Sequence, residues 1–346
     1  MKKILSILIP VYNTEKYIKR CLDSILLDEI KEMIEVIIVN DGSKDNSLKI
    51  AKSYQKKFPN TVVIIDKENG GHGSTINKGI EVAKGNYFRV LDSDDWFQSY
   101  DFIKFVKLLK EETADLVISN YRQEHIYNSK SIFFEYKNLI SNKLYEFDSF
   151  NLSILNGEYF VMATSTYKLD ILKKSGLHLM EKTFYVDMQY NIIPILEVNN
   201  FVFYNLDIYR YFIGRKDQSM NLMSFVRNQD HHEKVMKFLI EYYISNKSKF
   251  SKNKEQYIKM ILKYMLNTHY TIYCIYETNH KQAYKKIKSF DQYLKQNSLE
   301  LYELTNDITY IRENRKYKFF FVKFGSKLFN KMYSVARIVK RRCEKK

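Results

Sequence analysis

The 346-residue sequence predicts an α/β fold with a doubly wound, mostly parallel sheet, followed by a helical and strongly basic C-terminal region. Over the first 120 residues, short and nearly uncharged runs of β-branched residues alternate with helical stretches. This alternation is typical of parallel strands that are covered on both faces. The connections between the runs are short, which favours right-handed crossovers. Beyond residue 222 the hydrophobic period becomes helical and the charge becomes basic.

The first strands are expected where apolar residues continue with almost no charge, at residues 4–11, 36–40, 62–66, 87–91 and 116–119. The helices between them are expected at residues 15–27, 46–58, 74–83 and 100–112. The second of these helices follows Asp41-Gly42-Ser43, a turn whose side chains favour a helix start. Sheets of this kind bind ligands beyond the carboxyl ends of their strands. Polar residues that directly follow a strand are therefore candidate site residues.

The later elements are predicted from aromatic-rich runs and from helical periodicity. Strands are expected at residues 132–136 and 201–212, and helices at residues 167–175 and 188–196. Further helices are expected at residues 226–243, 254–276, 282–296 and 317–342. The change of period and charge places a domain boundary after residue 221, with one domain over residues 1–221 and a helical region over residues 222–346.

The whole net charge of +16 lies in the C-terminal region. Residues 1–221 carry 29 basic and 29 acidic residues, whereas residues 222–346 carry 27 and 11. Within residues 316–346, apolar side chains recur every three or four positions among Lys and Arg, as in a helix that lies in a membrane interface. An anionic membrane surface is therefore an expected partner, and a helix packed on the body is the alternative. Nucleic acid is not expected, because the body shows no motif for it.

The sequence also indicates where the protein works. The longest uncharged run, residues 264–276, has 13 residues and is too short to cross a bilayer as a helix. The N-terminus lacks the cleavage site of a signal peptide. Cys21, Cys274 and Cys343 are too widely spaced for a disulfide framework or a metal site. We therefore expect a cytoplasmic protein that lies peripherally at the inner face of the cell membrane.

Three strand ends carry polar motifs. They read Pro10-Val11-Tyr12-Asn13, Asn40-Asp41-Gly42-Ser43 and Leu91-Asp92-Ser93-Asp94-Asp95-Trp96. The three carboxylates of the last motif repel one another, and a divalent cation such as Mn²⁺ or Mg²⁺ would make the cluster favourable. Taken alone, this motif could also be a solvated acidic turn before the next helix.

In their order and spacing these motifs resemble the family 2 glycosyltransferases, which have the GT-A fold. The matching stretches are residues 6–25 (SILIPVYNTEKYIKRCLDSI), 35–47 (EVIIVNDGSKDNS) and 67–96 (KENGGHGSTINKGIEVAKGNYFRVLDSDDW). Weaker support comes from residues 184–190 (FYVDMQY) and 209–220 (YRYFIGRKDQSM). The resemblance implies an inverting, metal-dependent enzyme that moves a hexose or N-acetylhexosamine from a UDP-sugar to a hydroxyl acceptor. That acceptor would be a saccharide, a lipid-linked molecule or a polymer in the synthesis of cell-surface polysaccharide, wall polymer or glycoconjugate.

The resemblance also implies which residues bind the donor. Asp41 is expected at the uracil edge, where a carboxylate accepts from the imide N–H that cytosine lacks. Asn77 stands where relatives often carry an arginine. Asp94, together with Asp92, is implied as the ligand of Mn²⁺ or Mg²⁺, and Asp95 is interpreted as structural. The other implied donor contacts are Pro10, Tyr12, Asn69, Ser93, Arg215, Gln218 and Ser219, with Asp92 on the ribose side.

Asp187 is the implied general base. A base must take the proton of the acceptor hydroxyl as that hydroxyl attacks the anomeric carbon, and a carboxylate within hydrogen-bond reach suffices. Relatives often carry a Glu-Asp pair here, whereas this sequence has Val186-Asp187. Glu181 is the reserve candidate, and the alternative role of Asp187 is to stabilise the start of the following helix.

Two other functions remain open from the sequence. A sugar nucleotidyltransferase would need a glycine-rich motif with Arg and Lys after the first strand, and residues 10–13 carry none. A non-catalytic binding or scaffold protein with the same fold is the second alternative. His72, between two glycines, could contact a phosphate but is interpreted as an incidental loop residue. His231-His232 is not expected to bind a metal.

Overall fold

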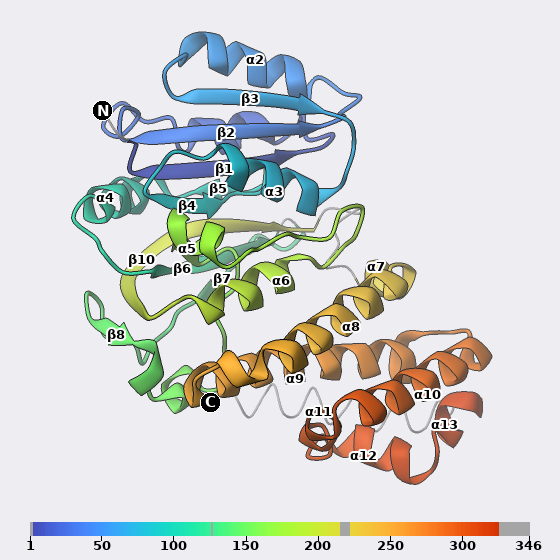
Figure 1. Cartoon of the computed structure of the whole chain (residues 1–346). Coiled ribbons are helices and arrows are strands. Elements are labelled where there is room, and N and C mark those ends of the chain that lie inside the picture. Colours follow the sequence, from blue (N-terminus) through green and yellow to red (C-terminus); the bar gives the residue numbers. More distant parts are fainter. Residues whose placement is uncertain (1–2, 126, 215–221, 325–346) are drawn as a thin grey trace. The chain divides into compact units, whose positions relative to one another are not determined.

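The computed structural model describes residues 3–125, 127–214 and 222–324. Its N-terminal part alternates strands and helices as the sequence predicts (Figure 1). The strands are β1 (Leu5–Val11), β2 (Ile34–Asp41), β3 (Val62–Lys67), β4 (Tyr87–Val90) and β6 (Leu116–His125). The helices are α1 (Ile18–Asp23), α2 (Ser47–Lys57), α3 (His72–Val82) and α4 (Ser99–Leu109).

The remaining strands of the sheet are β5 and β7–β10, of which β10 is long and the others are short, and helices α5 and α6 lie among them along the chain. These elements are β5 (Trp96–Phe97), β7 (Lys130–Phe134), β8 (Leu144–Glu146), β9 (Ser165–Lys168), β10 (Asn200–Ile213), α5 (Leu169–Lys174) and α6 (Asp187–Ile192). The helix expected at residues 167–175 is wrong at its start, because residues 165–168 form β9 between β4 and β6. Three polar and aromatic residues in a row, Ser165-Thr166-Tyr167, give too short a run to show a strand period. β9 therefore depends on the strands beside it.

The sheet has ten strands, and its main order is β3-β2-β1-β4-β9-β6-β10-β5. Figure 1 shows β3, β2 and β1 side by side at one edge. β1, β2, β3 and β4 are parallel, and β6 and β10 run in the same direction because β9 is antiparallel to both β4 and β6. The predicted doubly wound, mostly parallel α/β sheet is thus confirmed.

β1 and β2 are buried along their whole length. Full burial of a Val, Leu or Ile side chain stabilises a fold by about 1.5–3 kcal/mol, so these two strands anchor the sheet. β4 is anchored in a different way, by the buried guanidinium of Arg89. It donates to Thr166 Oγ1 at 3.0 Å, to Ser119 Oγ at 3.0 Å and to the Ala163 carbonyl at 2.6 Å. These hydrogen bonds fix β4, which leads into the acidic motif, against β6 and β9.

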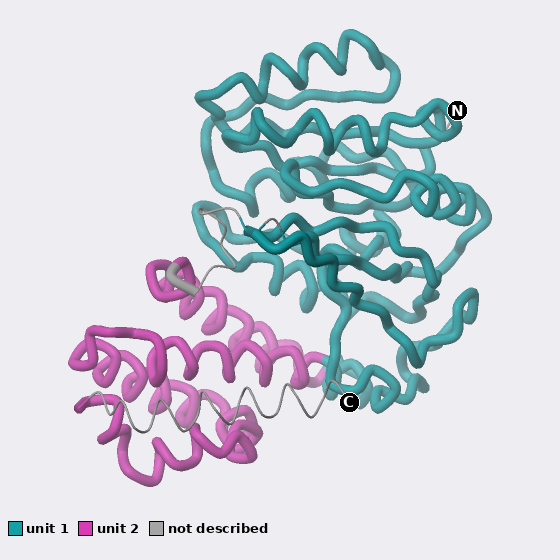
Figure 2. Tube along the Cα trace, turned by 180° about the vertical axis from the view of Figure 1, so that it is seen from behind, with its two compact units in different colours: residues 1–218, 249–257 teal, residues 219–248, 258–346 magenta. Residues whose placement is uncertain are grey.

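The chain divides into two compact units (Figure 2). Unit 1 consists of residues 1–218 and 249–257, and unit 2 of residues 219–248 and 258–346. Residues 249–257 belong to unit 1 because their side chains bond to its backbone. Asn253 Nδ2 donates to the carbonyls of Phe147 at 3.0 Å and Phe150 at 2.7 Å, and Lys254 Nζ donates to that of Leu196 at 2.8 Å. The domain boundary after residue 221 stays a prediction.

The described part of the C-terminal region is helical, as predicted. Its helices are α7 (Leu222–Arg227), α8 (Gln229–Asn246), α9 (Lys252–Thr271), α10 (His280–Asn297), α11 (Leu299–Leu304), α12 (Thr309–Lys316) and α13 (Phe320–Phe324). A π-helical turn, Ile272–Tyr276, continues α9. None of the helices described is both long and apolar enough to span a membrane.

The helix expected to run on from residue 317 is wrong at its start. Lys318 and Phe319 have positive φ angles of 49° and 60°, so the chain turns between α12 and α13. Phe319, in this turn, and Val322, in α13, are buried. Residues 325–346, which hold most of the predicted basic tail, lie outside the described residues.

Two histidines pair inside unit 2. His232 and His269 are buried, their rings are nearly parallel at 14°, and their Nδ1 atoms lie 3.2 Å apart. Burial lowers the pKa of His232 to about 4 and holds that of His269 well below its ordinary value. Both rings are therefore neutral at pH 7 and belong to the helical core.

Candidate functional site

The sheet has its topological switch point between β1 and β4. β1 lies between β2 and β4, and the chain runs from β1 through β2 and β3 before it returns to β4 on the other side. Doubly wound sheets bind ligands in the crevice at such a point, outside the carboxyl ends of the strands. Tyr12, which follows β1, is 51% exposed there. The predicted residues after β1, β2 and β4 therefore share one edge of the sheet.

The loop after β1 is tied to the loop after β2. Pro10 lies in β1 beyond Leu8↔Val90, the last residue pair between β1 and β4. Proline is tolerated there because no hydrogen bond to β4 requires the backbone N–H that it lacks. Asn13 has a positive φ of 52°, and its Oδ1 accepts from the Lys44 backbone N–H at 2.8 Å. These contacts hold Tyr12 at the end of its strand.

Asp41 organises the loop between β3 and α3. Its buried carboxylate accepts from the backbone N–H groups of Gly70 and Gly71, each at 2.8 Å, and from Lys67 Nζ at 2.9 Å. Gly71 has a φ of +82°, which favours glycine. Asn69 joins the same arrangement, because its Nδ2 donates to the Asp41 carbonyl at 2.9 Å. Asp41 thus supports the glycine loop, and its contact with uracil stays a prediction.

The side chain of Asn77 forms hydrogen bonds with the segment before α6. Its Nδ2 donates to the Leu179 carbonyl at 2.9 Å, and its Oδ1 accepts from the Leu179 N–H at 2.8 Å. This pair of bonds fastens the segment before α6 to α3. Both ends of the amide are used in this pair, and the donor contact expected of Asn77 stays a prediction.

The acidic motif after β4 divides into two half-buried and two buried residues. Asp92 and Asp94 are half-buried, whereas Ser93 and Asp95 are buried. Asp95 Oδ2 accepts from the Tyr209 hydroxyl at 2.6 Å and Oδ1 from the Phe212 N–H at 2.7 Å. Burial, together with the charges of Asp94 and Asp92, raises the pKa of Asp95 well above its ordinary value. Asp95 therefore joins the acidic motif to β10.

Arg20 supports the same motif from α1. Its Nη2 donates to the Asp94 carbonyl at 2.8 Å, and its guanidinium carbon lies 3.7 Å from the Trp96 ring centroid and 4.5 Å from that of Phe212. Contacts of this kind between a guanidinium and an aromatic face stabilise a fold by about 0.5–2 kcal/mol. Arg20 fixes the backbone of the acidic motif.

Asp187 is the first residue of α6, and the segment before it rests on the glycine loop. The Lys182 N–H donates to the Gly70 carbonyl at 2.6 Å, and Tyr185 has a positive φ of 67°, unusual for a bulky residue. Burial raises the pKa of Asp187 above its ordinary value, while the charge of His72 opposes this shift. Glu181, the reserve base, has an exposed side chain on this segment.

His72 connects the glycine loop to the carboxylate of Asp92. Its Nε2 lies 2.9 Å from Asp92 Oδ1. Burial lowers the pKa of His72, but the charges of Asp92, Asp187 and Asp94 outweigh it and raise the pKa above its ordinary value. The sequence interpretation treated this residue as incidental and did not include it among the site residues. Its position at the start of α3, after the loop that follows β3 at the carboxyl edge of the sheet, was the signal that could have identified it.

Three predicted donor residues, Arg215, Gln218 and Ser219, lie outside the described residues. In the described part of the chain, no cluster of three or more His, Cys, Asp or Glu side chains is arranged to hold a metal ion. Asp92 and Asp94 still fit Mn²⁺ or Mg²⁺, because such cations take one or two protein carboxylates and complete their shell with phosphate oxygens and water.

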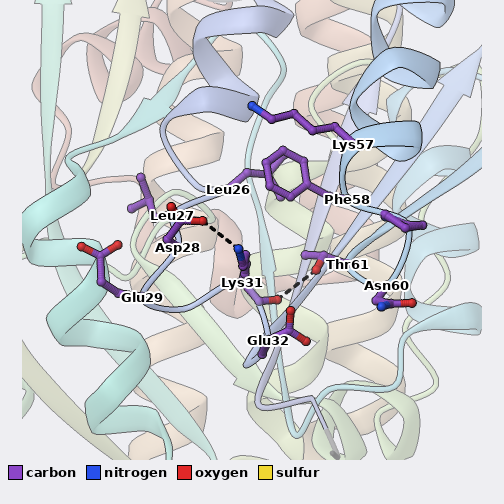
Figure 3. Close-up of a pocket in the computed structure, with 11 residues that line it drawn as sticks. Leu26, Leu27, Asp28, Glu29, Lys31, Glu32, Lys57, Phe58, Asn60 and Thr61 are labelled. Atoms are coloured by element: carbon purple, nitrogen blue, oxygen red, sulfur yellow. Dashed lines mark hydrogen bonds and ion pairs between the residues drawn. The ribbon is translucent and has the colours of Figure 1, made fainter.

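A separate hollow of about 700 Å³ lies where the chain enters β2 and β3 (Figure 3). Its walls come from residues 26–29, 31–32 and 57–61, including the Asp28–Lys31 ion pair at 2.8 Å. None of the strand-end residues contributes to its lining, so it is not part of the candidate site.

The fold and the strand-end residues define a GT-A-type α/β protein, and comparison with known proteins assigns its family. Residues 6–173 match the glycosyl transferase family 2 profile. The predicted resemblance to the family 2 glycosyltransferases is thus confirmed over residues 6–173.

The matches to curated relatives cover only part of this chain. The putative glycosyltransferase EpsH of Bacillus subtilis is 46% identical over 119 residues, which cover 34% of each chain. A poly(ribitol-phosphate) beta-glucosyltransferase of Bacillus spizizenii is 41% identical over 120 residues, which cover 34% of this chain and 19% of that protein. The chain thus matches about a third or less of the length of these relatives.

Solved structures extend the likeness in fold. S. aureus TarS 1–349 in complex with UDP-GlcNAc aligns with a TM-score of 0.62 at 18% identity, over 90% of this chain and 92% of that one. The complex of the same protein with UDP aligns with a TM-score of 0.66 at 16% identity, over 96% and 92%. At this identity the likeness shows the fold, and the predicted GT-A fold with a helical C-terminal region is confirmed.

Proposed function

We propose that the protein is an inverting glycosyltransferase that moves a hexose or N-acetylhexosamine from a UDP-sugar to a hydroxyl acceptor. The observation that carries this proposal is the hydrogen bond between His72 and Asp92 at the switch point of the sheet, where the charge of Asp187 also helps to raise the pKa of His72. Family membership supports sugar transfer, and the UDP-GlcNAc complex of TarS supports a UDP-sugar as donor. The poly(ribitol-phosphate) relative supports an acceptor in wall polymer or cell-surface polysaccharide synthesis.

In the proposed reaction, the acceptor hydroxyl attacks the anomeric carbon opposite the diphosphate. A bond forms between the acceptor oxygen and that carbon, the bond to the diphosphate oxygen breaks, and the configuration inverts. Asp187 takes the hydroxyl proton, and its raised pKa suits a general base. Asp94 and Asp92 would hold Mn²⁺ or Mg²⁺, whose chemistry here is to neutralise the departing diphosphate.

A screen for UDP release tests the proposal. The full chain is incubated with UDP-glucose, UDP-galactose and their N-acetyl forms, with Mn²⁺, with Mg²⁺ or with EDTA, and with GDP-mannose as a control. We expect UDP release from at least one UDP-sugar and none from GDP-mannose. A protein that binds UDP but releases none from any sugar would instead be a scaffold.

We further propose that the basic C-terminal tail holds the enzyme at the inner face of the cell membrane. The described start of the tail supports this, because Phe320 and Phe324 are 55% and 62% exposed beside Lys316, Lys318 and Lys323. Exposed aromatic rings flanked by lysines are typical of interfacial segments.

Deleting residues 325–346 is expected to release the protein from anionic vesicles and to leave its UDP-sugar turnover unchanged. The deletion begins after Phe324 because Phe319 and Val322 are buried. Each basic residue near an anionic surface contributes about 1 kcal/mol of attraction. Co-sedimentation with vesicles that contain phosphatidylserine measures the effect, and neutral vesicles are the control. If the truncated chain sediments like the full chain, the membrane is not bound by this tail.

A further inference from the structure

The backbone around His72 is fixed from three sides. Asp41 holds the N–H groups of Gly70 and Gly71, and the Gly70 carbonyl accepts from Lys182. A Cβ at Gly73 would meet the Met180 carbonyl oxygen at 2.3 Å, so the segment before α6 packs directly on the start of α3. His72 therefore starts its helix with little freedom to move.

The side chain of His72 lies among carboxylates that come from different elements. Its Nε2 is 2.9 Å from Asp92 Oδ1, on the loop after β4. Asp187, at the start of α6, is close enough for each group to shift the pKa of the other. The imidazole is 35% exposed, so one part of it is packed and the other faces solvent.

The hydrogen bond with His72 fixes the orientation of the Asp92 carboxylate. A carboxylate that is held through one oxygen keeps a fixed orientation, and its second oxygen remains for a ligand. Without that bond, Asp92 would turn away from Asp94, because two carboxylates on one short loop repel each other. A donor would then have to reorient Asp92 on binding, which costs affinity.

We propose that His72 is a positioning residue of the transfer site. Nε2–H donates to Asp92 Oδ1 and directs the second oxygen of Asp92 toward the nucleotide-sugar. The inference rests on the proposed function for the identity of the ligand, and on the structure alone for the hydrogen bond.

His72→Ala tests the inference through donor binding. Calorimetry with UDP and with the UDP-sugar that the full chain uses should show a dissociation constant raised about tenfold, the loss of one charge-assisted hydrogen bond. The KM for the donor should rise by a similar factor, while kcat and the melting temperature change little. His72→Gln, whose amide can still donate to Asp92, should recover part of the affinity.

His178→Ala is the matched control, because His178 is exposed on the segment before α6. Donor affinity equal to wild type in His72→Ala would overturn the inference, as would a lowered melting temperature with kcat reduced and KM unchanged.

If the wild type releases no UDP from any sugar, the proposed function fails, and the hydrogen bond is still tested by nitrogen-15 NMR. The His72 ring signals should shift in Asp92→Asn and stay in place in Asp66→Asn. Unchanged signals in Asp92→Asn would also overturn the inference.

Discussion

Asp187→Asn is expected to lower the turnover of the enzyme on the order of 10²–10⁴-fold, as the loss of a general base does, while UDP-sugar binding persists. The amide is nearly isosteric with the carboxylate but cannot take the proton of the acceptor hydroxyl. Since Asp187 starts α6 and its neighbour Met188 is buried, the pocket should survive the exchange. Steady-state kinetics and calorimetry with UDP measure the two quantities separately.

The matched control for this variant is Glu181→Gln. Glu181 lies six residues before Asp187 in the same segment, and its side chain is exposed. The Glu181→Gln enzyme should keep a turnover within a few fold of that of the wild type. Equal losses of donor affinity and rate in Asp187→Asn would point to a structural role, and a large loss in Glu181→Gln would make Glu181 the base.

Asp94→Ala is expected to abolish transfer and to weaken donor binding. The variant loses a carboxylate proposed to hold the metal ion that neutralises the diphosphate. EDTA should inactivate the wild type, and Mn²⁺ or Mg²⁺ should restore it. In Asp94→Ala neither cation should restore turnover at concentrations that saturate the wild type.

Asp28→Ala serves as the control for charge removal. Asp28 is exposed, and its ion pair with Lys31 lies where the chain enters β2, away from the site. Exposed pairs of this kind contribute little to stability, so its activity should match wild type. A wild type that keeps full activity in EDTA would show that the metal assignment is wrong.

Much of the N-terminal sheet could be predicted because its signals are local. The runs that became β1, β2, β3 and β4 are nearly uncharged and flanked by turn residues, so each shows its structure within a few positions. The strand-end motifs were found for the same reason. β5, β8 and β9 were missed. They have two to four residues and, unlike the four-residue β4, do not lie in a longer apolar run, so they form only against neighbouring strands.

The sequence by itself determined the fold class, the order of the strand-end motifs and the family, because these depend on hydrophobic period and on short contiguous patterns. Only the tertiary structure decided which polar groups meet. His72 and Asp92 are 20 positions apart, and Asn77 and Leu179 are 102 positions apart, yet each pair is joined by hydrogen bonds. Such contacts depend on the crossovers and on how the segment before α6 packs on the glycine loop. A hydrogen bond needs its two atoms within about 3 Å, a condition that residue type and spacing along the chain do not contain.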